Sequence, residues 1–262
     1  MLARLKTLLR RAPWFYKWAR RNWLSWRYRL GPGPDAVQLR FYSEFVRPGD
    51  LVFDVGANVG TKTALFVALG AKVVAFEPQP ECARILAKRF SYPSSVRVVP
   101  KGLAAESGTL TLNICSEAPV LSSFSPDWTT GPFAGYESDE QVEVEVITLD
   151  AALQQFGTPQ FIKVDVEGYE RSVLRGLSKP VRAMSYEFHS SLIDEALECA
   201  KMLERLGLQE FNVALGEESA LHAPGWLDYS ALECALRALA LDSTESWGDV
   251  YARTGDTPRC TV

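Results

Sequence analysis

Two stretches of the chain place acids and a histidine where they could move a proton. FIKVDVEGYE (161–170) and RAMSYEFH (182–189) alternate polar and apolar residues, so each puts its polar side chains on one face of a strand. Ligands of open α/β sheets bind beyond the carboxyl ends of the strands. We therefore expect the polar side chains of both stretches to meet at one edge of a sheet. They are Lys163, Asp165, Glu167, Glu187 and His189.

These side chains offer two ways of activating a hydroxyl. His189 is a natural general base because the intrinsic pKa of imidazole lies near neutrality. Asp165 and Glu187 could orient that imidazole, or they could join His189 as ligands of a divalent cation such as Mg²⁺ that acidifies the hydroxyl. Lys163 is expected to pair with the neighbouring acids and, with Glu167, to face the substrate. The spacing leaves both routes open, and a purely structural role for His189 is the alternative to either.

A glycine-rich turn earlier in the chain has the form of a ligand-binding loop. In LVFDVGANVG (51–60) a short apolar strand ends near Asp54, and Gly56, Asn58 and Gly60 supply conformationally permissive residues before a helix. We expect Gly56 to let a ligand lie against bare backbone, the loop N–H groups to bind its polar atoms, and the Asp54 carboxylate to face an ammonium group. S-Adenosylmethionine carries such a group. The alternative is a plain strand-to-helix turn with Asp54 as its cap.

The residues around this turn favour a nucleoside over a dinucleotide. The fingerprint Gly-x-Gly-x-x-Gly would need glycine at 58 and 61, where the chain has Asn58 and Thr61, so a nicotinamide enzyme is disfavoured. The next apolar stretch, 72–76, is followed by Glu77, whose carboxylate can accept both hydroxyls of a ribose that lies across two neighbouring strands. On its own, Glu77 would be interpreted as a solvent-exposed residue at the end of a strand. After the glycine-rich turn, Asp54 and Glu77 bracket one nucleoside site.

Charge is distributed unevenly along the 262-residue chain. Residues 1–30 contain nine Lys or Arg and no acid, whereas the formal net charge of the chain is −4, so the remainder is acidic. An acidic body argues against an extended nucleic-acid footprint. Five cysteines without a C-x-x-C pair indicate a reducing compartment. No apolar stretch is long enough to predict a spanning helix or a secretion signal. We expect a cytoplasmic protein.

The basic arm is predicted to form two short amphipathic helices. Its leucines and tryptophans recur at three- and four-residue intervals on either side of Pro13. Tryptophan opposite arginine suits an anionic membrane interface, so we expect the arm to hold the protein at the inner membrane face. The alternatives are packing on its own domain or on a second copy in a homodimer, and binding of single-stranded nucleic acid.

Beyond a Gly-Pro linker the chain alternates strands and helices. The arm and linker occupy 1–34 and a single domain occupies 35–262. The alternation predicts an α/β fold with a mostly parallel seven-stranded sheet, helices on both faces and a late antiparallel pair. Glu170 is expected to face solvent or to support the start of a helix. Strands are expected at 51–55, 72–77, 95–100, 161–166, 182–188, 208–214 and 248–253, and helices at 35–46, 60–69, 79–90, 149–156, 168–177 and 191–206.

One segment departs from this alternation. Stretches at 109–114 and 141–149 have the period-two pattern of half-exposed strands. They flank a polar, aromatic insertion at about 115–140. Loops of this length inside a domain are usually functional or mobile. We expect the insertion to lie on the substrate side of the sheet, and a surface excursion is the alternative.

Taken in order, LVFDVGANVG, VVAFEPQP, FIKVDVEGYE and MSYEFH make the chain similar to the FkbM family of S-adenosylmethionine-dependent methyltransferases, over about residues 40–190. The resemblance implies a class I (Rossmann-like) methyltransferase fold and O-methylation, commonly of sugar or polyketide hydroxyls. By match to the family's motifs, the cofactor would contact Asp54, Gly56, Asn58, Gly60 and Glu77. The substrate would lie at or near Asp165, Glu167, Glu187 and His189.

The absence of two motifs also favours oxygen as the methyl acceptor. The chain has no Asp-Pro-Pro-Tyr or Asn-Pro-Pro-Tyr sequence of the kind used to methylate amino groups of nucleic acids, and no Pro-Cys pair that would attack cytosine. We therefore expect an O-methyltransferase that acts on a glycan or small molecule. The alternatives are an RNA methyltransferase that uses the basic arm, and a catalytically inactive binding module with the same fold.

Overall fold

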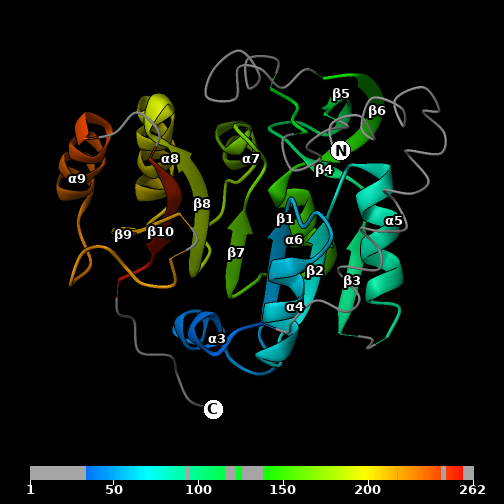
Figure 1. Cartoon of the computed structure of the whole chain (residues 1–262), viewed down its shortest axis with the longest axis horizontal. Coiled ribbons are helices and arrows are strands. Elements are labelled where there is room, and N and C mark those ends of the chain that lie inside the picture. The colour runs from blue at the N-terminus through cyan, green and yellow to red at the C-terminus, as the bar shows by residue number, and fades with distance from the viewer. Residues whose placement is uncertain are drawn as a thin grey trace, which may run out of the picture.

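A seven-stranded sheet runs through the centre of the domain (Figure 1). The computed structural model describes residues 34–92, 95–115, 122–125, 138–216, 218–242 and 246–255. The strand order is β3-β2-β1-β7-β8-β10-β9, with β10 antiparallel to both of its neighbours and the other pairings parallel. The predicted α/β architecture with a late antiparallel strand pair is therefore confirmed. The strands are β1 (Leu51–Val55), β2 (Lys72–Phe76), β3 (Val96–Val99), β7 (Phe161–Val164), β8 (Ala183–His189), β9 (Glu210–Leu215) and β10 (Trp247–Arg253).

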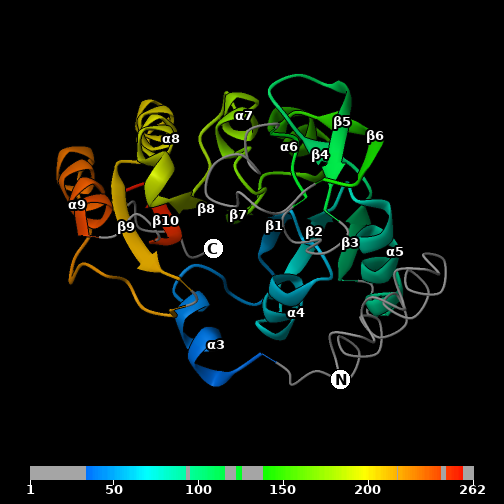
Figure 2. The same ribbon diagram turned by 45° about the horizontal axis from the view of Figure 1, so that its top comes forward.

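Helices cover both faces of this sheet. Figure 2 shows α6, α7 and α8 on one side and α3 and α4 on the other. The helices are α3 (Ala36–Tyr42), α4 (Thr61–Ala68), α5 (Pro80–Arg89), α6 (Leu149–Phe156), α7 (Glu170–Arg175), α8 (Ile193–Arg205) and α9 (Tyr229–Asp242). The helix expected at 191–206 is preceded by a 3₁₀ turn, Ser190–Leu192, and α9 was not among the expected helices. None of the helices in the described part of the chain is long and apolar enough to cross a membrane.

The alternating strand pattern separates two hydrophobic cores. In β7, Ile162 and Val164 pack into the core under α6, α7 and α8, whereas Phe161 packs into the core under α3 and α4. Lys163 lies on the same face as Phe161, as the alternation predicts. The polar residues of β7 and β8 therefore leave the sheet on the α3–α4 side and reach its carboxyl edge there.

A second, three-stranded sheet contains the two half-exposed strands. It consists of β4 (Gly102–Leu103), β5 (Gly108–Ile114) and β6 (Glu140–Ile147) in the order β4-β6-β5. In β6, Val144 and Val146 are buried while Glu143 and Glu145 are exposed, which confirms the period-two interpretation. The sequence analysis did not predict that these strands leave the main sheet. Most of the predicted insertion, like the N-terminal arm with its amphipathic helices, lies outside the described residues.

Candidate active site

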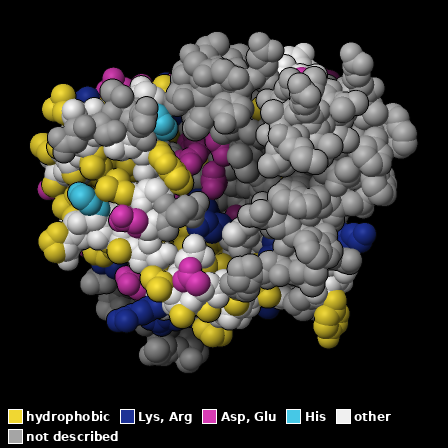
Figure 3. Space-filling view, viewed as in Figure 1, with side chains coloured by type: hydrophobic (Ala, Val, Ile, Leu, Met, Phe, Trp, Pro, Cys, Tyr) yellow, Lys and Arg dark blue, Asp and Glu magenta, His cyan; other side chains and the backbone are white. Residues whose placement is uncertain are grey.

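Three carboxylates meet at the carboxyl ends of β7 and β8. Carboxylate oxygens of Asp165, Glu167 and Glu187 all lie within 4.8 Å of one another, and the three residues are half-buried. The parallel pairing that aligns Lys163 with Ser185 brings the two strand ends together. Figure 3 shows acidic side chains inside a hollow on this face of the molecule. The predicted meeting of polar side chains from the two strands is therefore observed.

The surroundings of this carboxylate cluster disfavour negative charge. Burial, followed by the charge of Asp165, raises the pKa of both Glu167 and Glu187 well above its usual range. The Oε2 atom of Glu187 is buried and accepts no hydrogen bond from the described residues. A buried acceptor of this kind is satisfied by a proton, a cation, a water molecule or a donor from a ligand. The cluster is therefore suited to bind hydroxyl groups, to take up a proton or to hold a cation.

Lys163 lies beneath the cluster and pairs with two acids. Its Nζ is 3.2 Å from Oδ2 of Asp165 and 3.2 Å from Oδ1 of Asp249 on β10. Although burial lowers the pKa of Lys163, Asp165 and Asp249 raise it well above its ordinary value. The Tyr251 hydroxyl lies 3.4 Å from Asp249 Oδ2 and 3.2 Å from the hydroxyl of Tyr42. The expected pairing of Lys163 with acids is confirmed, but the sequence analysis missed Asp249.

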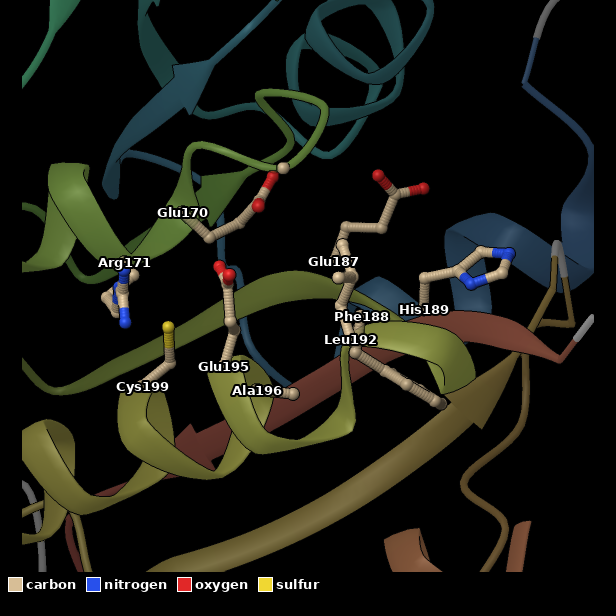
Figure 4. Close-up of a pocket in the computed structure, with 10 residues that line it drawn as sticks. Glu170, Arg171, Glu187, Phe188, His189, Leu192, Glu195, Ala196 and Cys199 are labelled. Carbon is tan, nitrogen blue, oxygen red and sulfur yellow. The ribbon is translucent and has the colours of Figure 1, made fainter. Parts of the chain in front are cut away.

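His189 does not join the three carboxylates. Its Nδ1 lies 2.8 Å from the Ser191 hydroxyl oxygen and 3.3 Å from the Ser191 backbone nitrogen, so Ser191 orients the ring. In Figure 4 the Glu187 side chain extends upward from β8 while His189 extends to the right. The sequence analysis grouped His189 with Asp165 and Glu187, and the structure places Glu167 in that group instead. Glu167 reaches it because the chain turns after β7, with Glu167 at φ 55°.

A cleft between α7 and α8 opens beside Glu187 (Figure 4). Its empty volume is about 340 Å³, and Glu170, Glu187 and His189 are among the residues that line it. Glu170 is buried and accepts the Val166 N–H at 3.0 Å. Burial raises its pKa to about 7. Of the two roles considered for Glu170, support of the helix start is therefore confirmed and exposure to solvent is wrong.

The two acids of the expected nucleoside site are both buried. Asp54 is 2% exposed, accepts the Thr63 hydroxyl, and has a pKa that burial raises to about 6. Glu77 is 6% exposed and accepts the Asn58 N–H at 2.6 Å and the Gln79 N–H at 2.7 Å. Burial raises the pKa of Glu77 to about 7. Each oxygen of Glu77 thus holds one backbone amide of the surrounding loops.

The glycines of the turn are required by packing within the protein. Gly56 has φ 80°, and a Cβ there would lie 1.8 Å from the carbonyl oxygen of Asp165. Gly60 has φ 86°, and a Cβ there would lie 2.5 Å from the side chains of Leu86 and Phe90. The end of β7 therefore fills the space on the Cβ side of Gly56. Asn58, at φ 50°, adopts the left-handed conformation expected of it.

The N–H groups at the start of the turn are also engaged. Gly56 and Ala57 both donate to the Phe76 carbonyl at 3.0 Å, and Asn58 donates to Glu77. The expectation that these N–H groups bind polar atoms of a ligand is corrected accordingly. The turn fixes the positions of Asp54, Glu77 and Asp165 relative to one another. The two acids of the expected nucleoside site therefore lie beside the carboxylate cluster.

One protein family matches the chain. The family model of the methyltransferase FkbM domain matches residues 54–220, well over half of the chain. The chain belongs to the FkbM methyltransferase family. The FkbM match includes every residue that the sequence analysis placed in the site and ends before β10, so Asp249 lies outside it. Family and fold together make the chain an S-adenosylmethionine-dependent methyltransferase.

The chain is similar to three curated methyltransferases. The 31-O-demethyl-FK506 methyltransferase FkbM of Streptomyces tacrolimicus is 31% identical over 183 residues, covering 58% of this chain and 69% of the relative. The hexuronic acid methyltransferase AglP of Haloferax volcanii is 29% identical over 174 residues, covering 64% and 67%. The methyltransferase sdnD of Sordaria araneosa is 29% identical over 157 residues, covering 49% and 60%.

Proposed function

We propose that the chain transfers the methyl group of S-adenosylmethionine to a hydroxyl of a sugar, in a saccharide or a lipid-linked glycoconjugate. The observation that carries this proposal is the cluster of Asp165, Glu167 and Glu187. Carboxyl groups offer several acceptor positions each, so three of them in a half-buried hollow suit a ligand with several hydroxyl donors. One relative is named for hexuronic acid and another for FK506, and a polyketide-type small molecule is the second acceptor class.

Asp54 and Glu77 would hold the methyl donor. Glu77 accepts one backbone N–H on each oxygen, and an ionised carboxylate has about four lone-pair positions. Two positions therefore remain for the two ribose hydroxyls. Asp54 offers a buried negative charge for the ammonium group, with Gly56, Asn58 and Gly60 shaping the loop between the two acids. S-Adenosylmethionine, when bound, supplies an electrophilic methyl group.

Glu187 would take the proton of the acceptor hydroxyl. It belongs to both the cluster and the cleft, and a carboxylate with a raised pKa is a stronger base near neutral pH than an ordinary one. Lys163 lies 3.2 Å from Oδ2 of Asp165 and holds that side chain in place, so Asp165 would orient the hydroxyl, with Glu167 as a further acceptor. His189, at the rim of the cleft, would pass the proton on to solvent.

A divalent cation such as Mg²⁺ is the second candidate for activating the hydroxyl. Three carboxylate oxygens within 4.8 Å of one another form the kind of hard oxygen donor set that Mg²⁺ prefers. Methyl transfer measured after EDTA treatment and after readdition of Mg²⁺ separates the two routes. Loss and recovery of activity would assign the cluster to the cation, whereas unchanged activity would assign the proton to Glu187.

The acceptor class is tested with labelled methyl groups. Purified protein and S-[methyl-³H]adenosylmethionine are added to a host-cell extract, which is then separated into lipid, polysaccharide, RNA and small-molecule pools, with Asp165→Asn as the control. Label in the lipid or polysaccharide pool that the control abolishes supports a saccharide acceptor. Label in the small-molecule pool supports the second acceptor class, and label only in RNA supports an RNA methyltransferase. A protein that neither labels any pool nor binds S-adenosylhomocysteine would be a binding module.

We further propose a cytoplasmic protein held at the inner membrane face by residues 1–30, with the catalytic domain at 35–262 and a substrate-side insertion at about 115–140. The support is the run of nine bases without an acid in the arm, since basic residues bind anionic lipids. The test is flotation of the full chain with anionic and neutral liposomes. Flotation with anionic liposomes only is expected, and no flotation would favour packing of the arm on the domain or on a second copy.

A further inference from the structure

Trp247 is a large aromatic side chain left partly exposed at the edge of the sheet that carries the candidate site. Its exposed fraction is 41%, and it is the first residue of β10. Because β10 is antiparallel to β8, its first residue lies at the same edge as the carboxyl end of β8. Trp247 also lies outside the region matched by the family model, which ends at residue 220.

The register of β8 and β10 places Trp247 next to the proposed acceptor site. Trp247 pairs with His189, and Asp249 pairs with Glu187. Side chains of directly paired residues lie on the same face of a sheet, and diagonal neighbours such as Trp247 and Glu187 are about 7–8 Å apart, within reach of long side chains. The indole leans over the end of β9, where its Cζ2 would lie 3.9 Å from a Cβ on Gly216. The indole ring thus adds an apolar surface to this edge of the sheet, beyond Glu187 and His189.

A pyranose has both hydroxyl groups and an apolar C–H face, and a flat apolar surface beside several carboxylates can bind both. The hydroxyls of the ring donate to acceptor-only groups, and the axial C–H groups on one side of the ring form an apolar face that packs on an aromatic ring. Sites for small ligands combine such aromatic walls with a few fixed polar groups. A saccharide that stacks on the indole, on the β9 side of β10, would extend one of its hydroxyls across the end of β10 to Glu187.

We infer that Trp247 is the stacking platform for the sugar ring of the acceptor, and that it fixes the ring while one hydroxyl reaches Glu187. This inference rests on the proposed function, because it requires a saccharide acceptor. The methyl-transfer residues lie inside the matched region, whereas Trp247 lies outside it, so the platform can change without changing the chemistry.

The inference is tested by saturation-transfer NMR on the full chain saturated with S-adenosylhomocysteine. The probes are methyl β-D-glucopyranoside, which has a C–H face, and sorbitol, which has hydroxyls but no ring. In the wild type, saturation should be strongest on the axial ring protons of the pyranoside and weak on sorbitol. Trp247→Ala should lower the affinity for the pyranoside about tenfold, as expected of an aromatic anchor, and Trp247→Phe should keep most of it.

The matched control is Tyr92→Ala, because Tyr92 is 88% exposed and follows α5, away from β8 and β10. Its affinity for the pyranoside should equal that of the wild type. Unchanged affinity and ring-proton pattern in Trp247→Ala would overturn the platform while leaving the proposed function intact. A wild type that binds S-adenosylhomocysteine but neither probe would overturn both the platform and the saccharide acceptor, without affecting the assignment of the donor site.

Discussion

Glu77 should make binding of the methyl donor depend on pH. Burial raises its pKa to about 7 from an ordinary 4.5, so the free enzyme carries a proton on this carboxyl below neutral pH. Two amide N–H groups already donate to it, and two ribose hydroxyls would bring the number of donors to four. Only the ionised carboxylate has acceptor positions for all four. Binding must therefore release a proton, and affinity must fall as the pH falls below 7.

The size of the effect follows from the pKa. If only the ionised form of Glu77 binds, affinity falls about tenfold between pH 8 and pH 6, and protonation of Asp54, whose pKa is about 6, makes the fall steeper at lower pH. Glu77→Gln removes the titrating group and also lacks acceptor positions for all four donors. We therefore expect weaker binding at pH 8, by about 1–3 kcal/mol, and an affinity that changes by no more than about twofold between pH 8 and pH 6, the pKa of Asp54.

Isothermal titration calorimetry with S-adenosylhomocysteine at several pH values measures this dependence. Repeating each titration in two buffers with different ionisation enthalpies counts the protons released. The control is Glu81→Gln, an exposed acid in the first turn of α5, which should keep the wild-type dependence. A wild-type affinity that is flat from pH 5 to pH 8 would refute the reasoning, as would a Glu77→Gln variant that keeps the wild-type slope above pH 6.

Two substitutions test how the site is held together. Gly56→Ala should lower the free energy of unfolding by about 3–5 kcal/mol in urea titrations. The alanine would have to adopt a left-handed backbone conformation, and its Cβ would overlap the Asp165 carbonyl. A loss below about 1 kcal/mol would contradict the packing role. Lys163→Met should cost about 3–5 kcal/mol by leaving half-buried Asp249 uncompensated. The double variant with Asp249→Asn should recover part of this loss in the same titrations, and no recovery would argue against the ion pair.

Regular strands could be predicted because the period-two pattern reports which faces are buried. The alternation in 161–164 and 183–189 correctly placed Lys163 and Glu187 on one face. The pattern loses its meaning where a strand ends, and β7 ends at Val164. Glu167 lies in the turn that follows, at φ 55°, so its position among the carboxylates depends on the turn. For this reason the sequence analysis expected Glu167 at this edge of the sheet but named His189, and not Glu167, as the third member of a group with Asp165 and Glu187.

Residues contributed by distant pairing could not be predicted. Asp249 and Trp247 join the site through the register of β10 on β8, which depends on tertiary contacts between segments about 60 residues apart in the chain. The glycine-rich turn shows a different limit of prediction from sequence. The sequence correctly indicated that Gly56 needs a conformation without a side chain, but whether a ligand or the end of β7 fills the space beside it is decided by packing.

The central claim is that one edge of the sheet holds separate donor and acceptor groups. Asp165→Asn tests it most directly, because Asp165 lies among the acceptor carboxylates and pairs with Lys163 rather than with Glu77. The measurement is S-adenosylhomocysteine affinity by calorimetry together with ³H-methyl transfer to the labelled pool of the extract. The account predicts an affinity within about threefold of wild type, a difference below about 0.7 kcal/mol, with transfer lost. Wild-type transfer by Asp165→Asn, or loss of S-adenosylhomocysteine binding in a folded variant, would contradict it.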